Sequence, residues 1–379
     1  MSFIAQRIDY FNSSDFRDAV RKQASLKDPI DLSIGVPEEN TAEHIKAAGI
    51  QSILEDKTVY TPSNGILSLR ELLATKLQTE NKIPCTAEIV TVVPGLTTGQ
   101  LLVYLAVLNP EDEVIVFDPY YPPYSYLVSM AGARVVYVST LPSFQPDLKA
   151  MEAAITHKTK IVVINSPNNP SGAVYPESTL RAIAAIAEKH NLLIVSDEIY
   201  EHFVYDVKHF SIGSIYPNTI TMNGFSKEYA MTGWRIGYIT GPQEIIDAIN
   251  ELQQYIVMST SSIAQHAAVA ALKSNPPNIV GKYRHKRDII VEQLSKAGFS
   301  IQGAQGAFFV FLKAPDDLTD TEFVDRATEH GLIIVPGRAF SQLHGYVRIS
   351  YGAKLESVEK GLDIISKITS DLALQRQVV

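Results

Sequence analysis

Short runs of apolar, mostly β-branched residues alternate with amphipathic stretches between about residues 88 and 240. The amphipathic stretch PESTLRAIAAIAEKHN, at 176–191, has apolar residues at helical spacing. Apolar strands that alternate with helices are typical of a parallel sheet that is buried on both faces. We therefore expect an α/β fold. The runs are EIVTVV, EVIVFD, RVVYV, KIVVIN, LLIVSD, TITMN and RIGYIT, at 88–93, 113–118, 134–138, 160–165, 192–197, 219–223 and 235–240.

The pattern changes near residue 276. From there the sequence predicts a basic helix, a second helix and three strands, which form a smaller α/β unit. The N-terminal segment, up to about Ala47, is free to pack against this unit. We expect three parts: an N-terminal segment at 1–47, a large domain at 48–275 and a small domain at 276–379. The predicted helices lie at 282–298 and 320–331, and the strands at 307–312, 332–337 and 346–351.

Length and charge narrow the class of protein. The chain has 379 residues, and single cores rarely grow past about 250–300 residues, so two domains are expected. The net charge of −8 leaves no basic surface in bulk for nucleic acid. No apolar run approaches the roughly 20 residues of a membrane span. The single cysteine and the absence of a signal-peptide pattern favour the cytoplasm. A large soluble enzyme is the expected class.

Ligands of such sheets bind at the loops that follow the strands. SPNNPSG, at 166–172, follows one strand, although such a turn is ordinary by itself. Asp197 ends an apolar strand, where a carboxylate needs a cationic partner unless it caps a helix. The Pro-Gly pair before the apolar helix at 96–108 offers free backbone N–H groups to a phosphate. Neither the dinucleotide pattern nor the P-loop pattern is present there.

The stretch GFSKEYAMTGWRIG, at 224–237, places Lys227 and Arg235 eight positions apart. A lysine in a pocket of low dielectric can form a Schiff base with a carbonyl, and an arginine can grip a phosphate. Taken by itself, a lysine such as Lys227 is more often a solvated surface residue. An amine, a buried acid, a phosphate seat and an arginine together match pyridoxal 5′-phosphate.

These residues resemble the class I and II pyridoxal-phosphate aminotransferases of the aspartate aminotransferase superfamily. The resemblance covers about residues 15–365. It implies a large domain with a mostly parallel seven-stranded sheet between layers of helices. It also implies a smaller α/β domain built from the N-terminal segment and the C-terminal part. Beyond the lysine motif, the matching stretches are LSIGVP, YTPSNGILSLRELLA, DPYYPPY, NSPNNPSG, SDEIYEHF, GAFFVF, VPGRAF and VRISYG.

The resemblance also implies roles for single residues. Lys227 would bind the cofactor aldehyde and shuttle a proton, Asp197 would pair with the ring nitrogen, and Tyr200 would bond to the ring oxygen. Arg348 would take the substrate carboxylate, helped by Gly35 and by Asn169. The resemblance implies a homodimer and no metal. The remaining cofactor contacts would be Asn169, Tyr121, Ser226, Arg235, the backbone amides of Leu96 and Thr97, and Tyr60 from the partner subunit.

Plain alternatives remain for some of these residues. Tyr121 could serve only packing, Arg348 could lie on a surface strand, and Ser226 could merely shape the turn. Thr97 stands where some aspartate-specific relatives have a lysine for the distal carboxylate. This puts a preference for aspartate in doubt unless Arg338 or the partner subunit supplies a cation.

The expected activity is transfer of an amino group from an L-amino acid to a 2-oxo acid by a ping-pong mechanism. The alternatives are a C–S β-lyase, or other carbanion chemistry, on the same fold. A binding protein that kept the fold without catalysis is the alternative from another class.

Overall fold

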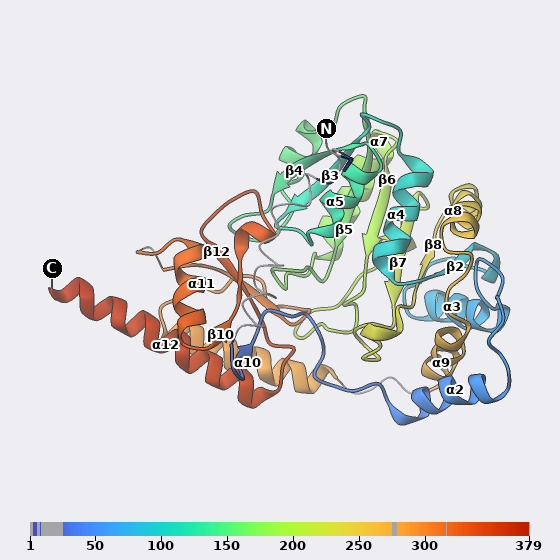
Figure 1. Ribbon diagram of the computed structural model, residues 1–379. Helices are drawn as coiled ribbons and strands as arrows, with labels where there is room; N and C mark the ends of the chain where they lie inside the picture. The colour runs from blue at the N-terminus through green and yellow to red at the C-terminus, as the bar shows by residue number, and fades with distance from the viewer. Residues whose placement is uncertain (1–2, 6–7, 9–25, 275–278, 316, 379) are drawn as a thin grey trace.

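A seven-stranded sheet lies at the centre of the computed structural model, which describes residues 3–5, 8, 26–274, 279–315 and 317–378 (Figure 1). The strand order is β2-β8-β7-β6-β5-β3-β4. Strand β8 is antiparallel to both of its neighbours, and the other pairs are parallel. The predicted mostly parallel sheet is confirmed. Its strands are β2 (Val90–Val93), β3 (Glu113–Asp118), β4 (Arg134–Ser139), β5 (Thr159–Asn165), β6 (Leu193–Asp197), β7 (Thr219–Gly224) and β8 (Gly237–Thr240).

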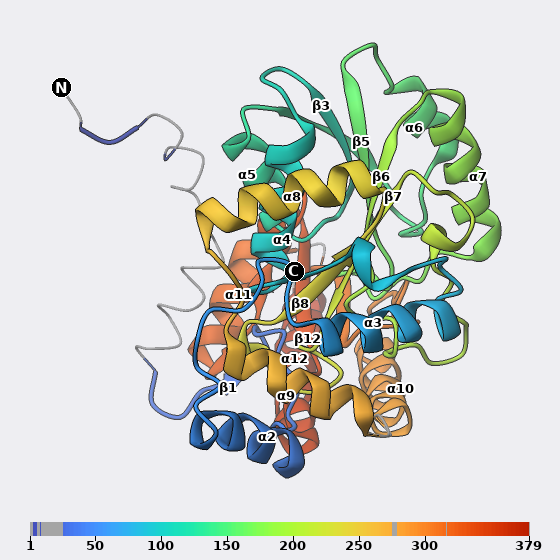
Figure 2. The same cartoon turned by 90° about the vertical axis from the view of Figure 1, so that its right-hand side faces the viewer.

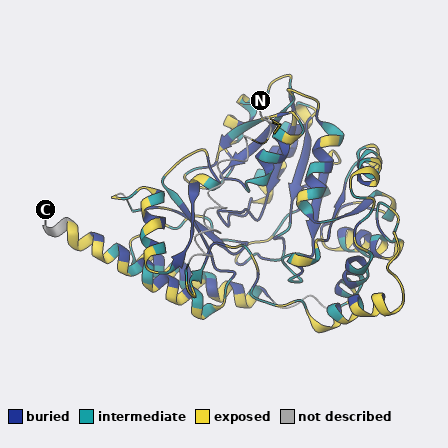
Figure 3. Cartoon of the chain, in the orientation of Figure 1, coloured by how far each residue is buried: buried dark blue, intermediate teal, exposed yellow. Residues whose placement is uncertain are grey.

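Helices cover both faces of this sheet. On one face, α4 (Leu96–Val107), α5 (Pro123–Met130) and α8 (Gln243–Ile256) bury their apolar sides against alternate strand residues such as Val116 and Val195. On the other face, α6 (Leu148–Ala153) and α7 (Glu177–Lys189) pack on the residues between, such as Ile115 and Ile194. Because both faces are covered, the central strands are buried along their whole length (Figure 3). That is why they read as continuous apolar runs.

A second group of elements lies on the side of the molecule that carries the C-terminus (Figure 1). Strands β9 (Phe309–Lys313), β11 (Val335–Pro336) and β12 (Tyr346–Ser350) form an antiparallel sheet in the order β11-β12-β9. The N-terminal strand β1 (Ile30–Asp31) pairs in parallel with β10 (Leu332–Ile333). The helices of this group are α10 (Val280–Lys296), α11 (Asp320–Glu329) and α12 (Leu355–Val378). The predicted domain boundary at 275/276 lies outside the described residues.

Three further helices pack beside the β2 edge of the sheet. They are α2 (Glu43–Leu54), α3 (Leu67–Thr79) and α9 (Ser262–Lys273), with α2 and α9 in contact with each other (Figure 2). Short 3₁₀ turns complete the described chain: η2 (Ala87–Ile89), η3 (Ile212–Ser214), η4 (Thr232–Trp234) and η5 (Gly337–Ala339). Among the described helices, none is both long and apolar enough to cross a bilayer.

Candidate active site

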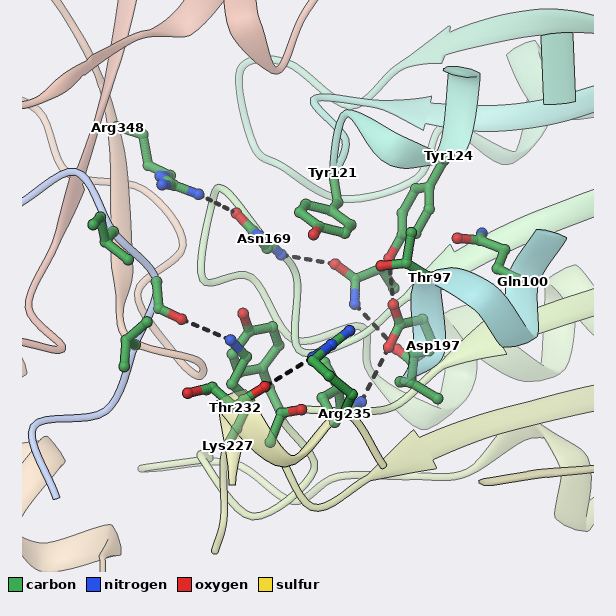
Figure 4. Close-up of a pocket in the computed structure, with 18 residues that line it drawn as sticks. Thr97, Gln100, Tyr121, Tyr124, Asn169, Asp197, Lys227, Thr232, Arg235 and Arg348 are labelled. Carbon is green, nitrogen blue, oxygen red and sulfur yellow. Dashed lines mark hydrogen bonds between the residues drawn. The ribbon is translucent and has the colours of Figure 1, made fainter. Parts of the chain in front are cut away.

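A cavity of about 250 Å³ opens at the carboxyl end of β6, between the large sheet and β12 (Figure 4). Its lining includes every predicted site residue except Tyr60. Segments that are far apart in the sequence meet here: the stretch after β1, the start of α4, the turn after β5, the ends of β6 and β7, and β12. The predicted residues that line it are Gly35, Leu96, Thr97, Tyr121, Asn169, Asp197, Tyr200, Ser226, Lys227, Arg235 and Arg348.

Asp197 is the last residue of β6, and it is buried. Tyr124 Oη donates to Asp197 Oδ2 over 2.7 Å, and the backbone N–H of Ile199 donates to Oδ1 over 3.2 Å. Burial raises the pKa of Asp197 to about 6, although the bond from Tyr124 acts against this rise. Turns follow Asp197 rather than a helix, so the helix-cap alternative is wrong. The carboxylate is placed to meet a cationic group inside the cavity.

Lys227 lies in the loop after β7, and its amine points into the cavity (Figure 4). Its Nζ donates to the carbonyl oxygen of Gly35 over 2.6 Å and lies 5.8 Å from the centre of the Tyr200 ring. Burial, together with the charge of Arg348, lowers the pKa of Lys227 to about 8, against an opposing effect of Asp197. The alternative of a solvated surface lysine is therefore wrong. A large fraction of this amine is neutral near pH 8 and can act as a nucleophile.

The start of α4 forms an anion seat beside Arg235. Gly95 precedes the helix with φ 83° and ψ 153°, and no described side chain caps this helix end. A Cβ at position 95 would lie 2.8 Å from Arg235 Cζ, so only glycine allows the guanidinium so close. Arg235 is itself left-handed, with φ 52°, and its Nη1 donates to the carbonyl oxygen of Thr232 over 2.9 Å. Free amides at a helix start beside a guanidinium suit a phosphate.

Arg348 projects from β12 and is almost fully buried. Its Nη1 donates to Asn169 Oδ1 over 3.0 Å, and its Nη2 donates to the carbonyl oxygen of Ser33. The guanidinium carbon lies 4.6 Å from the centre of the Phe309 ring and 4.3 Å from that of Phe340. Burial lowers the pKa of Arg348 to about 10, so the side chain stays charged at neutral pH. The surface-strand alternative is wrong.

One nitrogen of the Arg348 guanidinium has no hydrogen-bond acceptor among the described residues. Its Nε is buried and makes no hydrogen bond within the part of the chain that the structure describes. A buried charged donor without an acceptor is costly. A carboxylate bound in the cavity would supply that acceptor, and Arg348 therefore fits a carboxylate-binding role.

The end of β5 and the turn after it are hydrogen-bonded to Asp197 and Arg348. Asn165 Nδ2 donates to the carbonyl oxygen of Asp197 over 3.0 Å, and the backbone N–H of Asn169 donates to Asn165 Oδ1 over 2.8 Å. Asn169 is therefore fixed beside Arg348. Tyr121 lies at the wall of the cavity, with its ring edge-on to that of Tyr124 at 5.6 Å between centres. Its predicted stacking role stays a prediction, as does the contact of Ser226 with phosphate.

Two residues from the sequence analysis lie away from the cavity. Tyr60 sits between α2 and α3 and is 82% exposed. Arg338 lies in η5, is exposed, and does not line the cavity. Its proposed part in side-chain recognition finds no support from this position.

Several lining residues were not predicted from the sequence. Tyr124 contacts Asp197 directly; it lies in α5, whereas Tyr121 precedes that helix, and the available signal was its place in the stretch DPYYPPY. Gln100, one turn into α4, is buried and donates to Tyr104 Oη over 2.7 Å. The others carry no recognisable sequence signal. They are Ile34, Val36, Asn165, Ile199 and Thr232.

Residues 27–365 match the family model described as aminotransferase class I and II. The chain belongs to this family. An aspartate/prephenate aminotransferase of Thermus thermophilus is 40% identical over 354 residues, which are 90% of this chain and 91% of that one. Aromatic-amino-acid aminotransferase 2 of Thermococcus litoralis is 34% identical and covers 98% and 99% of the two chains. The protein is therefore an aminotransferase, and its family implies pyridoxal 5′-phosphate as the cofactor.

A solved structure supports the same assignment. The aspartate aminotransferase of Thermus thermophilus with maleate has a TM-score of 0.92 and 37% identity, and the match covers 97% of this chain and all of that one. The predicted fold family is confirmed.

Proposed function

We propose that this aminotransferase moves the amino group of an L-amino acid to a 2-oxo acid by a ping-pong mechanism, with pyridoxal 5′-phosphate held in the cavity described above. The observation that carries the proposal is the amine of Lys227. It has a lowered pKa and lies in one cavity with a buried carboxylate, an anion seat and a buried arginine. Those four groups complement the aldehyde, the ring nitrogen, the phosphate and the substrate carboxylate.

The donor set fits the cofactor group by group. Lys227 would hold the aldehyde carbon, Asp197 the protonated ring nitrogen, and Tyr200 with Asn169 the ring oxygen. When bound, the cofactor supplies an electron sink for the pair left at the substrate α-carbon. The phosphate would be held by Arg235, Ser226 and the backbone amides of Leu96 and Thr97, with the ring of Tyr121 along one face.

Proton transfer falls to the residues of this chain. The amine of Lys227 is positioned to take a proton from the α-carbon of a substrate that Arg348 holds, to keep it at Nζ and to return it. Its lowered pKa keeps a useful neutral fraction near pH 7 to 8. Asp197 keeps the ring nitrogen protonated, and the bond from Tyr124 stabilises the ionised form of Asp197.

Arg348 binds and orients the substrate. Its guanidinium plane is fixed by the Phe309 and Phe340 rings and by Asn169, and Nε is ready to donate to the α-carboxylate. A planar fork held in this way orients the α-carbon toward Lys227. The Gly35 backbone lies beside the same position, because its carbonyl oxygen accepts from Lys227.

The charges of the cavity favour a substrate with a neutral or aromatic side chain. Among the described residues, its lining cations are Lys227, Arg235 and Arg348, and each already has a proposed partner. A distal carboxylate would therefore lack a cation from this chain. The relatives carry names of both kinds, aspartate/prephenate and aromatic amino acid.

A homodimer is part of the proposal. Large apolar side chains are exposed at the end of α2, on the segment between α2 and α3 and at the end of α8, among them Leu54, Val59, Tyr60 and Tyr255. Tyr60 does not line the cavity of its own subunit, so it is free to reach the phosphate in a second subunit. Pairing of β1 with β10 supports grouping Ile30 and Asp31 with the proposed small domain at 276–379. Residues 43–47 belong to α2, which packs against α9 of the proposed large domain at 48–275. A free, buried Cys85 agrees with a cytoplasmic location.

A half-reaction screen tests the activity. The cofactor-loaded protein is mixed with each of the twenty amino acids, and the visible spectrum and the products are recorded. Amino transfer yields pyridoxamine phosphate and a 2-oxo acid, with neutral or aromatic amino acids reacting fastest and Lys227→Ala inactive. Pyruvate and ammonia from a sulfur amino acid, without pyridoxamine phosphate, would instead establish the lyase alternative.

A further inference from the structure

A cluster of charged side chains around the buried Glu201 lies next to the cavity without lining it. We call it the Glu201 cluster. Its carboxylates outnumber its cations by three to two, and the residues come from α3 and its end, from the turns after β6, and from the loop that carries Lys227. The members are Lys76, Glu80, Glu201, His202 and Glu228.

Glu201 is the centre of this cluster. Its Oε1 accepts from Lys76 Nζ and, over 2.5 Å, from Asn223 Nδ2 near the end of β7. Its Oε2 accepts from Asn81 Nδ2 over 2.5 Å. Burial alone would raise the pKa of Glu201, but the charges of Lys76 and His202 outweigh it and lower the pKa to about 2. The ionised carboxylate therefore binds α3, the turn after β6 and the end of β7 to one another.

His202 extends the cluster to the lysine loop. Its Nδ1 lies 3.0 Å from Glu228 Oε2, and its Nε2 lies 3.3 Å from Glu80 Oε2. Burial alone would lower the pKa of His202, but the bonds with Glu228 and Glu80 outweigh it and raise the pKa to about 10. The imidazole is thus a cation at physiological pH, held between one carboxylate at the end of α3 and one on the lysine loop.

Glu228 is the residue next to Lys227, and the two side chains have different surroundings. Lys227 lines the active-site cavity, whereas Glu228 pairs with His202 in the cluster and does not line that cavity. A covalent neighbour fixed by an ion pair limits the backbone torsions available to Lys227. Thr41 Oγ1 restrains the same loop from another side, because it donates to the carbonyl oxygen of Ala230 over 2.8 Å.

We propose that His202 is a positioning residue for Lys227: through its ion pair with Glu228 it fixes the loop so that the lysine amine stays in the cavity that Asp197 also lines. The Glu201–Lys76 ion pair holds the turn that carries His202 against α3. His202 touches neither substrate nor cofactor. The proposal rests on the proposed role of Lys227 as the residue that binds the aldehyde.

The two carboxylate partners of His202 offer a matched test. Glu228→Gln removes the charge on the lysine loop, whereas Glu80→Gln removes an equal charge at the end of α3. Glu228 is the more buried of the two, with 10% of its side chain exposed against 50% for Glu80, so a purely structural role would separate the variants in melting temperature but not in attachment rate. A positioning role would separate them in attachment rate as well, because only Glu228 is attached to the backbone of Lys227.

The measurement is the rate at which cofactor-free protein attaches pyridoxal phosphate. It is followed by visible absorbance and by borohydride trapping, with mass spectrometry of the peptide that contains Lys227. All variants are compared below the lowest melting temperature of the set. We expect Glu228→Gln and His202→Ala to slow attachment about 10- to 100-fold, since displacement by 1 Å costs that much. Glu80→Gln should stay within about twofold of the wild type.

Two further variants complete the design. The double variant His202→Ala/Glu228→Gln should be no slower than the slower single variant, because both changes remove one interaction. His202→Gln keeps a donor for Glu228 and should recover part of the rate, which also carries the test if His202→Ala does not fold.

The outcomes are distinct. Equal rates for Glu228→Gln and Glu80→Gln, with the wild type attached at Lys227, overturn the positioning role and leave the proposed function intact. Additive losses in the double variant would also overturn it. No adduct on Lys227 in the wild type overturns both proposals.

Discussion

The substitution Gly95→Ala should have two separate effects. It should lower the free energy of unfolding through backbone strain, and it should weaken cofactor binding because it disrupts the anion seat. With φ 83° and ψ 153°, Gly95 occupies a backbone region that is essentially limited to glycine. Alanine there should cost about 1–3 kcal/mol of folding free energy. In addition, the new Cβ would lie 2.8 Å from Arg235 Cζ, so the guanidinium must move away from the start of α4.

The loss of binding follows from the displaced arginine. One hydrogen bond between charged groups contributes about 1.5–3 kcal/mol. At about 1.4 kcal/mol for each factor of ten, the dissociation constant for pyridoxal phosphate should rise about 10- to 150-fold. This effect comes on top of the folding cost, because strain in the free protein and lost contacts to the ligand are measured in different equilibria.

Two assays distinguish the effects. Thermal melting of the cofactor-free protein measures the loss of stability caused by backbone strain. A visible-absorbance titration measures the dissociation constant for pyridoxal phosphate, which depends on the anion seat. Gly132→Ala is the matched control: Gly132 has φ 81°, and its nearest neighbour would be 3.8 Å from a new Cβ. The control should lose stability and bind the cofactor normally. If Gly95→Ala bound pyridoxal phosphate with wild-type affinity, the anion seat would not be the phosphate site.

Two other substitutions test the remaining anchors. Arg348→Lys loses the planar fork and about one charge-assisted bond to the α-carboxylate, so kcat/KM for amino transfer should fall about 10- to 150-fold; cofactor affinity should not change, and its loss would contradict the assignment. Tyr124→Phe removes the 2.7 Å bond that stabilises the ionised form of Asp197, so the pKa of Asp197 should rise further. Pyridoxal phosphate titrations should then show binding weakened about tenfold, most strongly at low pH, where the carboxyl is neutral; equal affinity at every pH would show that Tyr124 does not support Asp197.

Much of the large domain could be predicted because its strands are buried on both faces. Each of the seven apolar runs overlaps a strand, and Asp197 at the end of one strand and Lys227 in the loop after the next could be placed at the same edge of the sheet. Strand ends were less predictable. The run at 235–240 begins as a strand only at Gly237, because Arg235 is left-handed and turns the chain toward the anion seat.

Contacts between side chains were beyond prediction from the sequence. The hydrogen bond from Lys227 to Gly35 joins positions 192 residues apart, and that from Arg348 to Asn169 spans 179. No spacing rule relates such pairs. Glu228 and His202 look like ordinary surface residues in the sequence, and only the packing of α3 against the two loops brings them together beside the buried Glu201.

The most direct test of the account is the pH dependence of covalent attachment at Lys227. Cofactor-free protein is exposed to pyridoxal phosphate across a range of pH, reduced with borohydride and digested, and the labelled peptides are weighed. Because burial lowers the pKa of Lys227 from 10.5 to about 8, the amine is neutral above that pH and protonated below it. We predict label on Lys227 alone, with a midpoint near pH 8. Label spread over other lysines, or a midpoint near 10.5 at Lys227, would contradict it.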